Sequence, residues 1–125
     1  MPRASATAHE LARIELLGSL PGEQLAKLAG RMRRETVLAG AAPIVEGEEG
    51  DRFYAVLTGM FSVTKSGPGP RAILRPGDYF GEVALAMHVP RTATVRALTP
   101  AVVASCDLET FNEFIRPLFA DEPDD

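Results

Sequence analysis

Two residues of opposite charge lie close together in the chain. One follows a glycine, which gives the backbone more conformational freedom, and the other follows a proline, which restricts it. Glu82 follows Gly81 in the hexapeptide FGEVAL, and Arg91 follows Pro90 in the hexapeptide PRTATV. Glycine lets a backbone approach a ligand closely, and the residues after Gly81 favour a helical turn whose first amide N–H groups lack partners. Such a turn attracts anions, and the guanidinium of Arg91 can add two parallel hydrogen bonds to the same oxyanion. These residues therefore predict a phosphate site.

The carboxylate of Glu82 narrows the choice of ligand. A carboxylate repels a bound phosphate unless the ligand donates hydrogen bonds to it, and a sugar hydroxyl is a natural donor. A phosphate and a sugar together indicate a nucleotide.

Short strands must position this segment. Most of the 11 glycines and 10 prolines lie between residues 40 and 100, where they separate short apolar runs. We expect strands over residues 34–38, 43–45, 53–57, 61–65, 71–74, 92–98 and 101–106. The last run is a continuous one, typical of a strand buried on both faces. About eight strands at this spacing, with helices only at the ends, predict a mainly β fold of the jelly-roll type or a related sandwich.

Helices are predicted at both ends of the chain. Two short amphipathic helices are indicated by the spacing of Leu11, Ile14 and Leu17 and of Leu25, Leu28 and Met32. Asp107 is placed to cap a closing helix over residues 108–116, and Pro117 is expected to limit its length.

The overall composition excludes several classes of protein. The 125 residues suit one domain, which we place at residues 1–120, followed by a disordered acidic tail at 121–125. A net charge of −4 gives no general attraction to nucleic acid or anionic lipid, and no apolar run is long enough to span a membrane. One cysteine and two histidines provide neither a disulfide nor a zinc site, and no secretory signal is visible. A reducing, cytoplasmic location is expected.

The two hexapeptides resemble the phosphate-binding cassette of the cyclic-nucleotide-binding domain family. This family is shared by catabolite-activator regulators, cyclic-nucleotide-dependent kinases and cyclic-nucleotide-gated channels. The glycines at positions 47, 50 and 59 and the triplet Pro76-Gly77-Asp78 are similar to the turn residues of the family, so the resemblance extends from about residue 10 to 116.

The resemblance implies an eight-stranded jelly roll, or double-stranded β-helix barrel, that carries a short phosphate-binding helical turn. It also implies cAMP or cGMP as the ligand and no cofactor or metal. By position, Glu82 would accept the ribose 2′-hydroxyl and Arg91 would pair with the exocyclic phosphate oxygens. Thr92 could reach a guanine amino group. The complete implied site consists of Val63, Arg71, Gly81, Glu82, Val83, Ala84, Arg91, Thr92 and Ala93, with backbone N–H groups of Val83, Ala84 and Ala93 on the phosphate and Val63 and Arg71 beside the base.

Catalysis is not expected, because His9 and His88 cannot supply the two or three histidine ligands of a jelly-roll metalloenzyme. The short closing segment after residue 116 is expected to provide little or no lid over the base. An alternative is a degenerate fold of this family that serves as a protein–protein interaction module of a larger transporter, channel or enzyme. In either case an effector domain of a longer parent protein would use the module, and dimerisation stays open.

Overall fold

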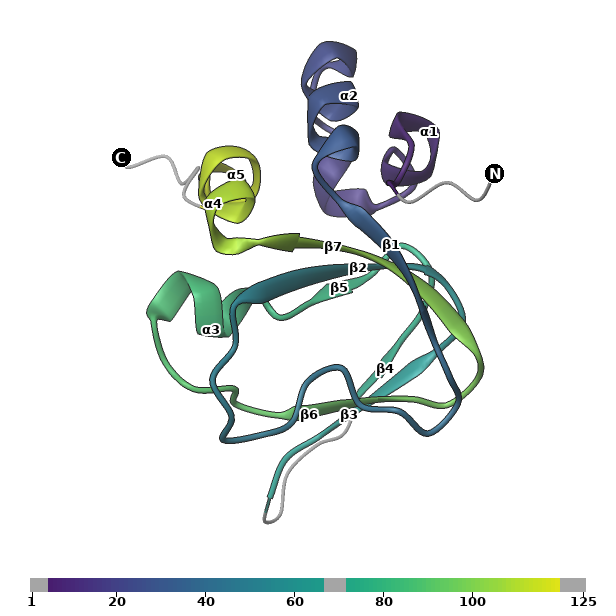
Figure 1. Cartoon of the computed structure of the whole chain (residues 1–125), viewed down its shortest axis with the longest axis vertical. Coiled ribbons are helices and arrows are strands. Elements are labelled where there is room, and N and C mark those ends of the chain that lie inside the picture. The colour runs from purple at the N-terminus through teal and green to yellow at the C-terminus, as the bar shows by residue number, and fades with distance from the viewer. Residues whose placement is uncertain (1–4, 67–71, 120–125) are drawn as a thin grey trace.

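The computed structural model describes residues 5–66 and 72–119, which form two antiparallel sheets with helices at both ends (Figure 1). The four-stranded sheet has, in spatial order, β1 (Arg33–Val37), β7 (Ala101–Asp107), β2 (Arg52–Thr58) and β5 (Tyr79–Phe80). The three-stranded sheet has β4 (Ala72–Leu74), β3 (Phe61–Thr64) and β6 (Thr94–Ala97). The mainly β fold with flanking helices is confirmed.

The described residues contain seven strands, one fewer than the jelly roll requires. The expected strand at 43–45 is reduced to an isolated bridge between Ile44 and Val95, where the Val95 N–H donates to the Ile44 carbonyl over 2.9 Å. Pro43 has no N–H group, so it cannot donate a hydrogen bond to a ladder at this position. The prediction also omitted β5, whose two residues are too few to show an alternating pattern.

An apolar core fills the space between the two sheets. Its buried side chains come from both sheets: Val37, Tyr54, Val56, Phe61, Phe80, Val95, Ala97, Ala101 and Val103. The rings of Tyr54 and Phe80 stack with centroids 4.8 Å apart. This core supports the end of β5, immediately before Gly81.

A second core lies between the outer face of the four-stranded sheet and the helices. The N-terminal helices are α1 (Ala8–Leu11), the 3₁₀ turn η1 (Glu15–Leu17) and α2 (Gly22–Gly30). The buried members of this core include the six residues whose spacing predicted helices: Leu11, Ile14, Leu17, Leu25, Leu28 and Met32. The first predicted helix is split into α1 and η1. β7 contributes Ala104 and Cys106 here and Val103 to the other core, so its burial on both faces is confirmed.

The C-terminal helix differs from the prediction at its end. Asp107 caps it as expected, accepting the Thr110 N–H over 2.9 Å. The helix then runs through α4 (Leu108–Thr110), the π turn η2 (Phe111–Ile115) and α5 (Arg116–Phe119), so Pro117 does not end it. Pro117 cannot donate to the carbonyl four residues earlier. The Arg116 N–H instead bonds to the carbonyl of Phe111, five residues earlier, and this π turn keeps the helix continuous.

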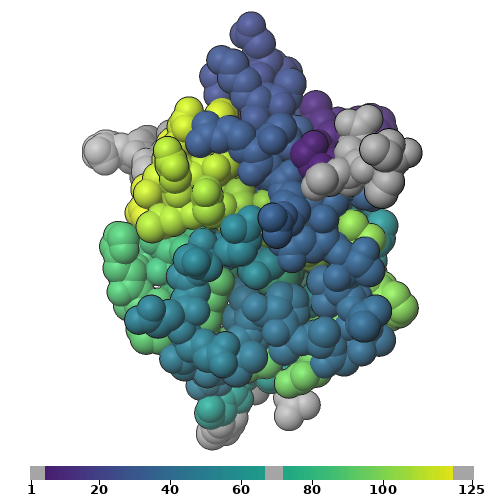
Figure 2. Space-filling view, viewed as in Figure 1, coloured from purple at the N-terminus to yellow at the C-terminus, as the bar shows by residue number. Residues whose placement is uncertain are grey.

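The helices at the two ends of the chain pack side by side above the sheets (Figure 2). The Arg31 guanidinium joins them by an ion pair with Glu113 over 2.7 Å and by lying 5.2 Å from the ring centroid of Phe114. Within residues 5–66 and 72–119, no helix combines the length and the apolar composition needed to cross a bilayer. The predicted acidic tail at 121–125 falls outside the described residues.

Candidate ligand-binding site

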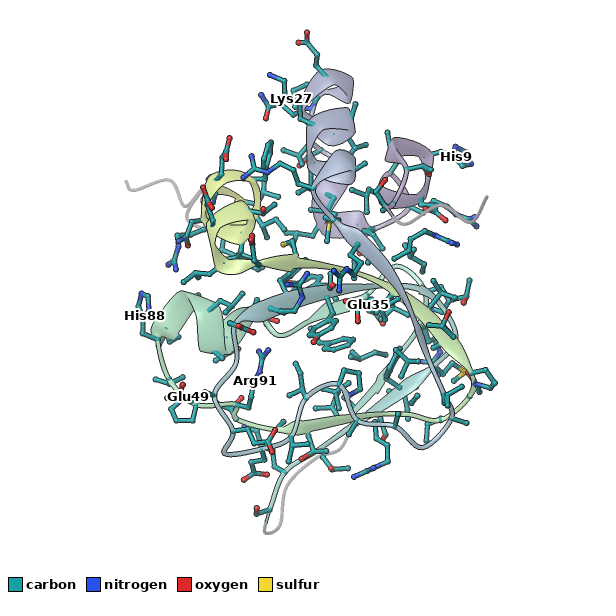
Figure 3. All side chains as sticks on the ribbon, viewed as in Figure 1. His9, Lys27, Glu35, Glu49, His88 and Arg91 are labelled. Carbon is teal, nitrogen blue, oxygen red and sulfur yellow. The ribbon has the colours of Figure 1, made fainter. Side chains whose placement is uncertain are left out.

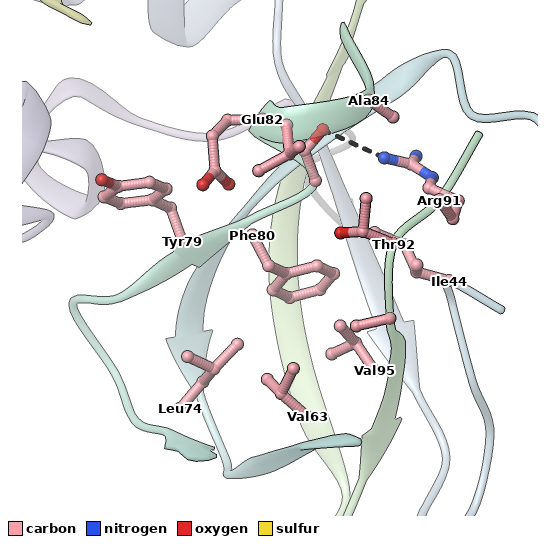
Figure 4. A pocket seen from close by; sticks show the side chains of 13 residues that line it. Ile44, Val63, Leu74, Tyr79, Phe80, Glu82, Ala84, Arg91, Thr92 and Val95 are labelled. Atoms are coloured by element: carbon pink, nitrogen blue, oxygen red, sulfur yellow. Dashed lines mark hydrogen bonds between the residues drawn. The ribbon is translucent and has the colours of Figure 1, made fainter. Parts of the chain in front are cut away.

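A cavity of about 190 Å³ opens between the helix α3 (Glu82–Met87) and the inner faces of the two sheets (Figure 4). Every predicted site residue except Arg71 lines it: Val63, Gly81, Glu82, Val83, Ala84, Arg91, Thr92 and Ala93. Arg71 lies outside the described residues. Two segments separated in sequence, 81–84 and 91–93, therefore meet at one cavity.

Gly81 sets the direction in which α3 begins. Its φ of 94° lies in the left-handed region, and a Cβ there would lie 2.8 Å from the Arg52 carbonyl oxygen. Both facts favour glycine. The amides of Val83 and Ala84 belong to the first turn of α3 and have no intrahelical partners, so they are free to donate to a ligand.

Arg91 lies in the protein interior, with only 7% of its surface exposed. Its guanidinium donates to the Gly81 carbonyl over 3.0 Å and to the Arg52 carbonyl over 2.9 Å. Its own backbone N–H bonds to the Glu48 carbonyl over 2.8 Å. Gly50 explains how the side chain fits, since a Cβ at that position would lie 1.9 Å from the Arg91 Nε atom. The guanidinium is therefore held in one place before any ligand binds.

The charge of Arg91 has no counter-ion in the described part of the chain, where no carboxylate forms an ion pair with it. Burial lowers the pKa of Arg91, and electrostatic interaction with Tyr54, Asp51 and Glu82 opposes this effect. Because a buried charge is costly unless it is paired, the site favours an anion beside this guanidinium.

Glu82 lies on the other side of the cavity, where its carboxylate points towards the ring of Tyr79 (Figure 4). Burial raises the pKa of Glu82, while the residue's own backbone N–H and the charge of Arg91 lower it. Burial, reinforced by the charge of Glu82, also raises the pKa of Tyr79. A partly desolvated carboxylate of this kind is a strong acceptor for a hydroxyl donor.

The remaining wall of the cavity is mostly apolar. Val63, which was predicted as a site residue, belongs to it. Its other residues were not predicted as site residues: Ile44, Leu74, Tyr79, Phe80 and Val95. Apolar residues on strands have the same pattern whether they face a core or a cavity, so the sequence cannot separate the two. The hydroxyl of Thr92 lies between this apolar region and Arg91 (Figure 4).

The two histidines of the chain lie on opposite sides of the molecule, His9 in α1 and His88 at the end of α3 (Figure 3). They cannot bind one metal ion together. The cavity thus combines a fixed cation, open amide donors, one carboxylate and an apolar wall, which suits an anionic ligand with a hydroxyl group and a flat apolar part.

Comparison with known proteins gives the family. The family model for the cyclic nucleotide-binding domain matches residues 34–117, which include both segments of the cavity. The chain belongs to the cyclic nucleotide-binding domain family.

Curated relatives of this cyclic nucleotide-binding domain are kinases and kinase regulators. It is 42% identical over 109 residues to a cAMP-dependent protein kinase regulatory subunit of Yarrowia lipolytica, covering 86% of this chain and 29% of that protein. It is 32% identical over 124 residues to the cGMP-dependent protein kinase egl-4 of Caenorhabditis briggsae, covering 94% of this chain and 17% of the kinase. The domain thus spans less than a third of each relative.

Solved structures share the fold. The regulatory domain of Toxoplasma gondii PKA, determined with cAMP, superposes with a TM-score of 0.80 at 31% identity, over 89% of this chain and 44% of that one.

Proposed function

We propose that the chain is a non-catalytic sensor that binds cAMP or cGMP in the cavity beneath α3. The observation that carries this proposal is Arg91, a buried cation whose guanidinium, among the described residues, bonds to backbone carbonyls and to no carboxylate, next to open amides and an apolar wall. A cyclic nucleotide supplies the missing anion, a hydroxyl donor for Glu82 and a flat base.

Each part of the ligand has a proposed partner. Arg91 pairs with the exocyclic phosphate oxygens, helped by the amides of Val83, Ala84 and Ala93. Glu82 accepts the ribose 2′-hydroxyl. Val63 lies in the apolar wall that would receive the base, and Thr92 would add a hydrogen bond to guanine.

The output of the sensor belongs to a longer protein. The relatives are a regulatory subunit and a kinase that exceed this chain several times in length. We infer that occupancy of the domain, residues 1–120, is transmitted to an effector domain, in the cytoplasm or in the cytosolic part of a membrane protein. An eight-stranded jelly roll is the finer form of this fold, and the bridged segment around Ile44 would supply its eighth strand.

The test is a calorimetric titration of the chain with cAMP and with cGMP. Wild type should bind one ligand per chain. Arg91→Ala should weaken binding by roughly 2–5 kcal/mol, because the phosphate loses the one cationic partner that the described residues place in the cavity. Arg91→Lys should restore part of the affinity, since an ammonium cannot reproduce the planar fork.

Arg96→Ala is the matched control, because Arg96 is exposed and its guanidinium bonds to the Gly40 carbonyl, away from the cavity. It should bind like wild type. Equal affinity of wild type and both Arg91 variants would contradict the assignment of the phosphate. A wild-type chain that binds neither nucleotide at millimolar concentration would instead favour a degenerate domain that acts as a protein-interaction module.

A further inference from the structure

Arg116, in the C-terminal helix, reaches across to the ligand-binding helix. Its guanidinium donates to the Leu85 carbonyl over 3.0 Å and to the Ala86 carbonyl over 3.2 Å, both in the last turn of α3. Figure 1 shows the C-terminal helix directly beside α3. One side chain thus connects two elements through residues that are 30 positions apart in sequence.

The local sequence fixes the direction of this side chain. The Arg116 Nε–H donates to the Asn112 Oδ1 atom over 2.8 Å, and the guanidinium lies 5.6 Å from the ring centroid of Phe111. The π turn before Pro117 adds a residue to the helical turn and so determines which side of the helix Arg116 occupies. All three guanidinium nitrogens are therefore engaged.

The helix α3 needs support of this kind at its C-terminal end. It has six residues, far fewer than an isolated helix needs to persist in water. It ends at His88, whose φ of 56° and ψ of 46° are left-handed and unfavourable for a residue other than glycine. His88 and Val89 satisfy the Ala84 carbonyl, and Arg116 satisfies the next two carbonyls. A cation at this end also complements the helix dipole.

The opposite end of α3 carries the ligand contacts. A short helix held at its C-terminal end keeps Glu82 and the amides of Val83 and Ala84 at a fixed distance from Arg91. We propose that Arg116 is a positioning residue of the nucleotide site, which it serves by anchoring the C-terminal end of α3 without touching the ligand. This inference rests on the proposed function, because its measured consequence is nucleotide affinity.

The test compares Arg116→Ala with Arg31→Ala in the whole chain. Arg31 is the matched control, because it also pairs with the C-terminal helix and lies over a phenylalanine ring, yet among the described residues none of its hydrogen bonds or ion pairs reaches α3. Arg116→Ala should raise the Kd for cAMP about tenfold, because a smaller fraction of molecules holds α3 in the binding orientation. Arg31→Ala should change this Kd less than twofold.

Two milder variants keep the test valid if Arg116→Ala does not fold. Arg116→Lys can donate to only one carbonyl at a time and should give an intermediate Kd. Asn112→Ala removes only the partner of the Arg116 Nε–H and should raise the Kd about threefold. Asn112 is exposed, so its loss should leave the core unchanged.

Amide hydrogen exchange of the ligand-free chain provides a readout that does not depend on binding. The amides of residues 86–89 should exchange faster in Arg116→Ala than in Arg31→Ala, because the end of α3 opens locally. Unchanged exchange, or a Kd for Arg116→Ala within twofold of that for Arg31→Ala, would overturn the positioning role alone. A wild-type chain that binds neither cAMP nor cGMP would overturn the proposed function together with it.

Discussion

Glu82 occupies a place that disfavours its negative charge until a ligand donates to it. Burial raises its pKa, so the folded, ligand-free protein binds a proton at this carboxyl more tightly than the unfolded chain does. The contribution of Glu82 therefore favours the folded state below the ordinary glutamate pKa, and this contribution is lost as the pH rises through the raised pKa of the folded state.

Glu82→Gln should remove this penalty. In the absence of ligand the variant should be more stable than wild type at pH 7, by on the order of 0.5–1 kcal/mol, because the carboxylate is partly solvated. The difference should disappear well below the ordinary glutamate pKa of about 4.3, where Glu82 is protonated in both the folded and the unfolded chain. Urea denaturation at several pH values measures it.

The same variant should bind cAMP more weakly and 2′-deoxy-cAMP with nearly unchanged affinity, since that analogue lacks the hydroxyl that Glu82 accepts. Equal losses for both ligands would show that Glu82 does not bind the ribose.

At the residue scale the sequence was informative where contacts are local. Gly81, Glu82 and Arg91 were predicted because two short segments combine residue types that suit a phosphate and a sugar. The burial of Arg91 and its contact with Gly50 could not be predicted, because they depend on the folding of a loop 41 residues away in sequence. In isolation, Gly50 indicates only a turn.

At the scale of one element, the cap of the C-terminal helix depends on pH. Hydrogen bonding to Thr110 lowers the pKa of Asp107, so the folded state favours the carboxylate. The stabilisation is present above the ordinary aspartate pKa of about 3.9 and is lost as the pH falls through the lower pKa of the folded state.

Asp107→Ala should destabilise the chain by about 1 kcal/mol at pH 7, the usual effect of losing a cap. Asp107→Asn should retain most of the cap at neutral pH and, unlike wild type, should not lose it on acidification. Thermal melting at pH 7 and pH 3 compares the three proteins. If wild type and Asp107→Asn respond alike to acid, the Asp107 cap does not contribute to this pH dependence.

Elements were predicted well where an apolar pattern is long and its ends are marked, as for α2 and β7. The segment around Pro43 and the end of the C-terminal helix were predicted less well. In both places a proline removes one hydrogen-bond donor, but the resulting local structures differ. Next to Pro43 there is an isolated bridge at Ile44, and before Pro117 there is a π turn. The packing around each proline determines which of these structures forms, and a local sequence pattern does not specify that packing.

At the scale of the whole molecule, ligand binding should be visible as stability. A ligand that binds only the folded chain stabilises it by ~2.7 kcal/mol at 100 times its Kd. For a domain of this size, cAMP should therefore raise the melting temperature by on the order of 10 °C. Scanning calorimetry at increasing cAMP concentration measures the shift, and Arg91→Ala should need far more ligand to show it. A constant melting temperature up to millimolar cAMP and cGMP would contradict the proposal.

The pairing of strands in the sheets could not be predicted from local sequence patterns. β7 pairs with β1 and with β2, so that Ser105 lies opposite Arg33 on one side and Tyr54 on the other. Such pairings join residues more than 50 positions apart, and alternation within a strand does not name its partner. The number and spacing of the strands predicted a jelly roll or a related sandwich, and the family resemblance, rather than periodicity, selected the eight-stranded jelly roll.

The aromatic residues around the cavity have an optical consequence. The chain has no tryptophan and two tyrosines, and both tyrosines lie at the site: Tyr79 lines the cavity, and Tyr54 stacks on Phe80, which also lines it. Burial raises the pKa of both phenols, so they stay neutral and emissive in ordinary buffers. Because tyrosine emits far more strongly than phenylalanine, most of the intrinsic ultraviolet fluorescence of this protein arises at or next to the wall of this cavity. We therefore expect binding of the proposed ligand to be measurable without a label.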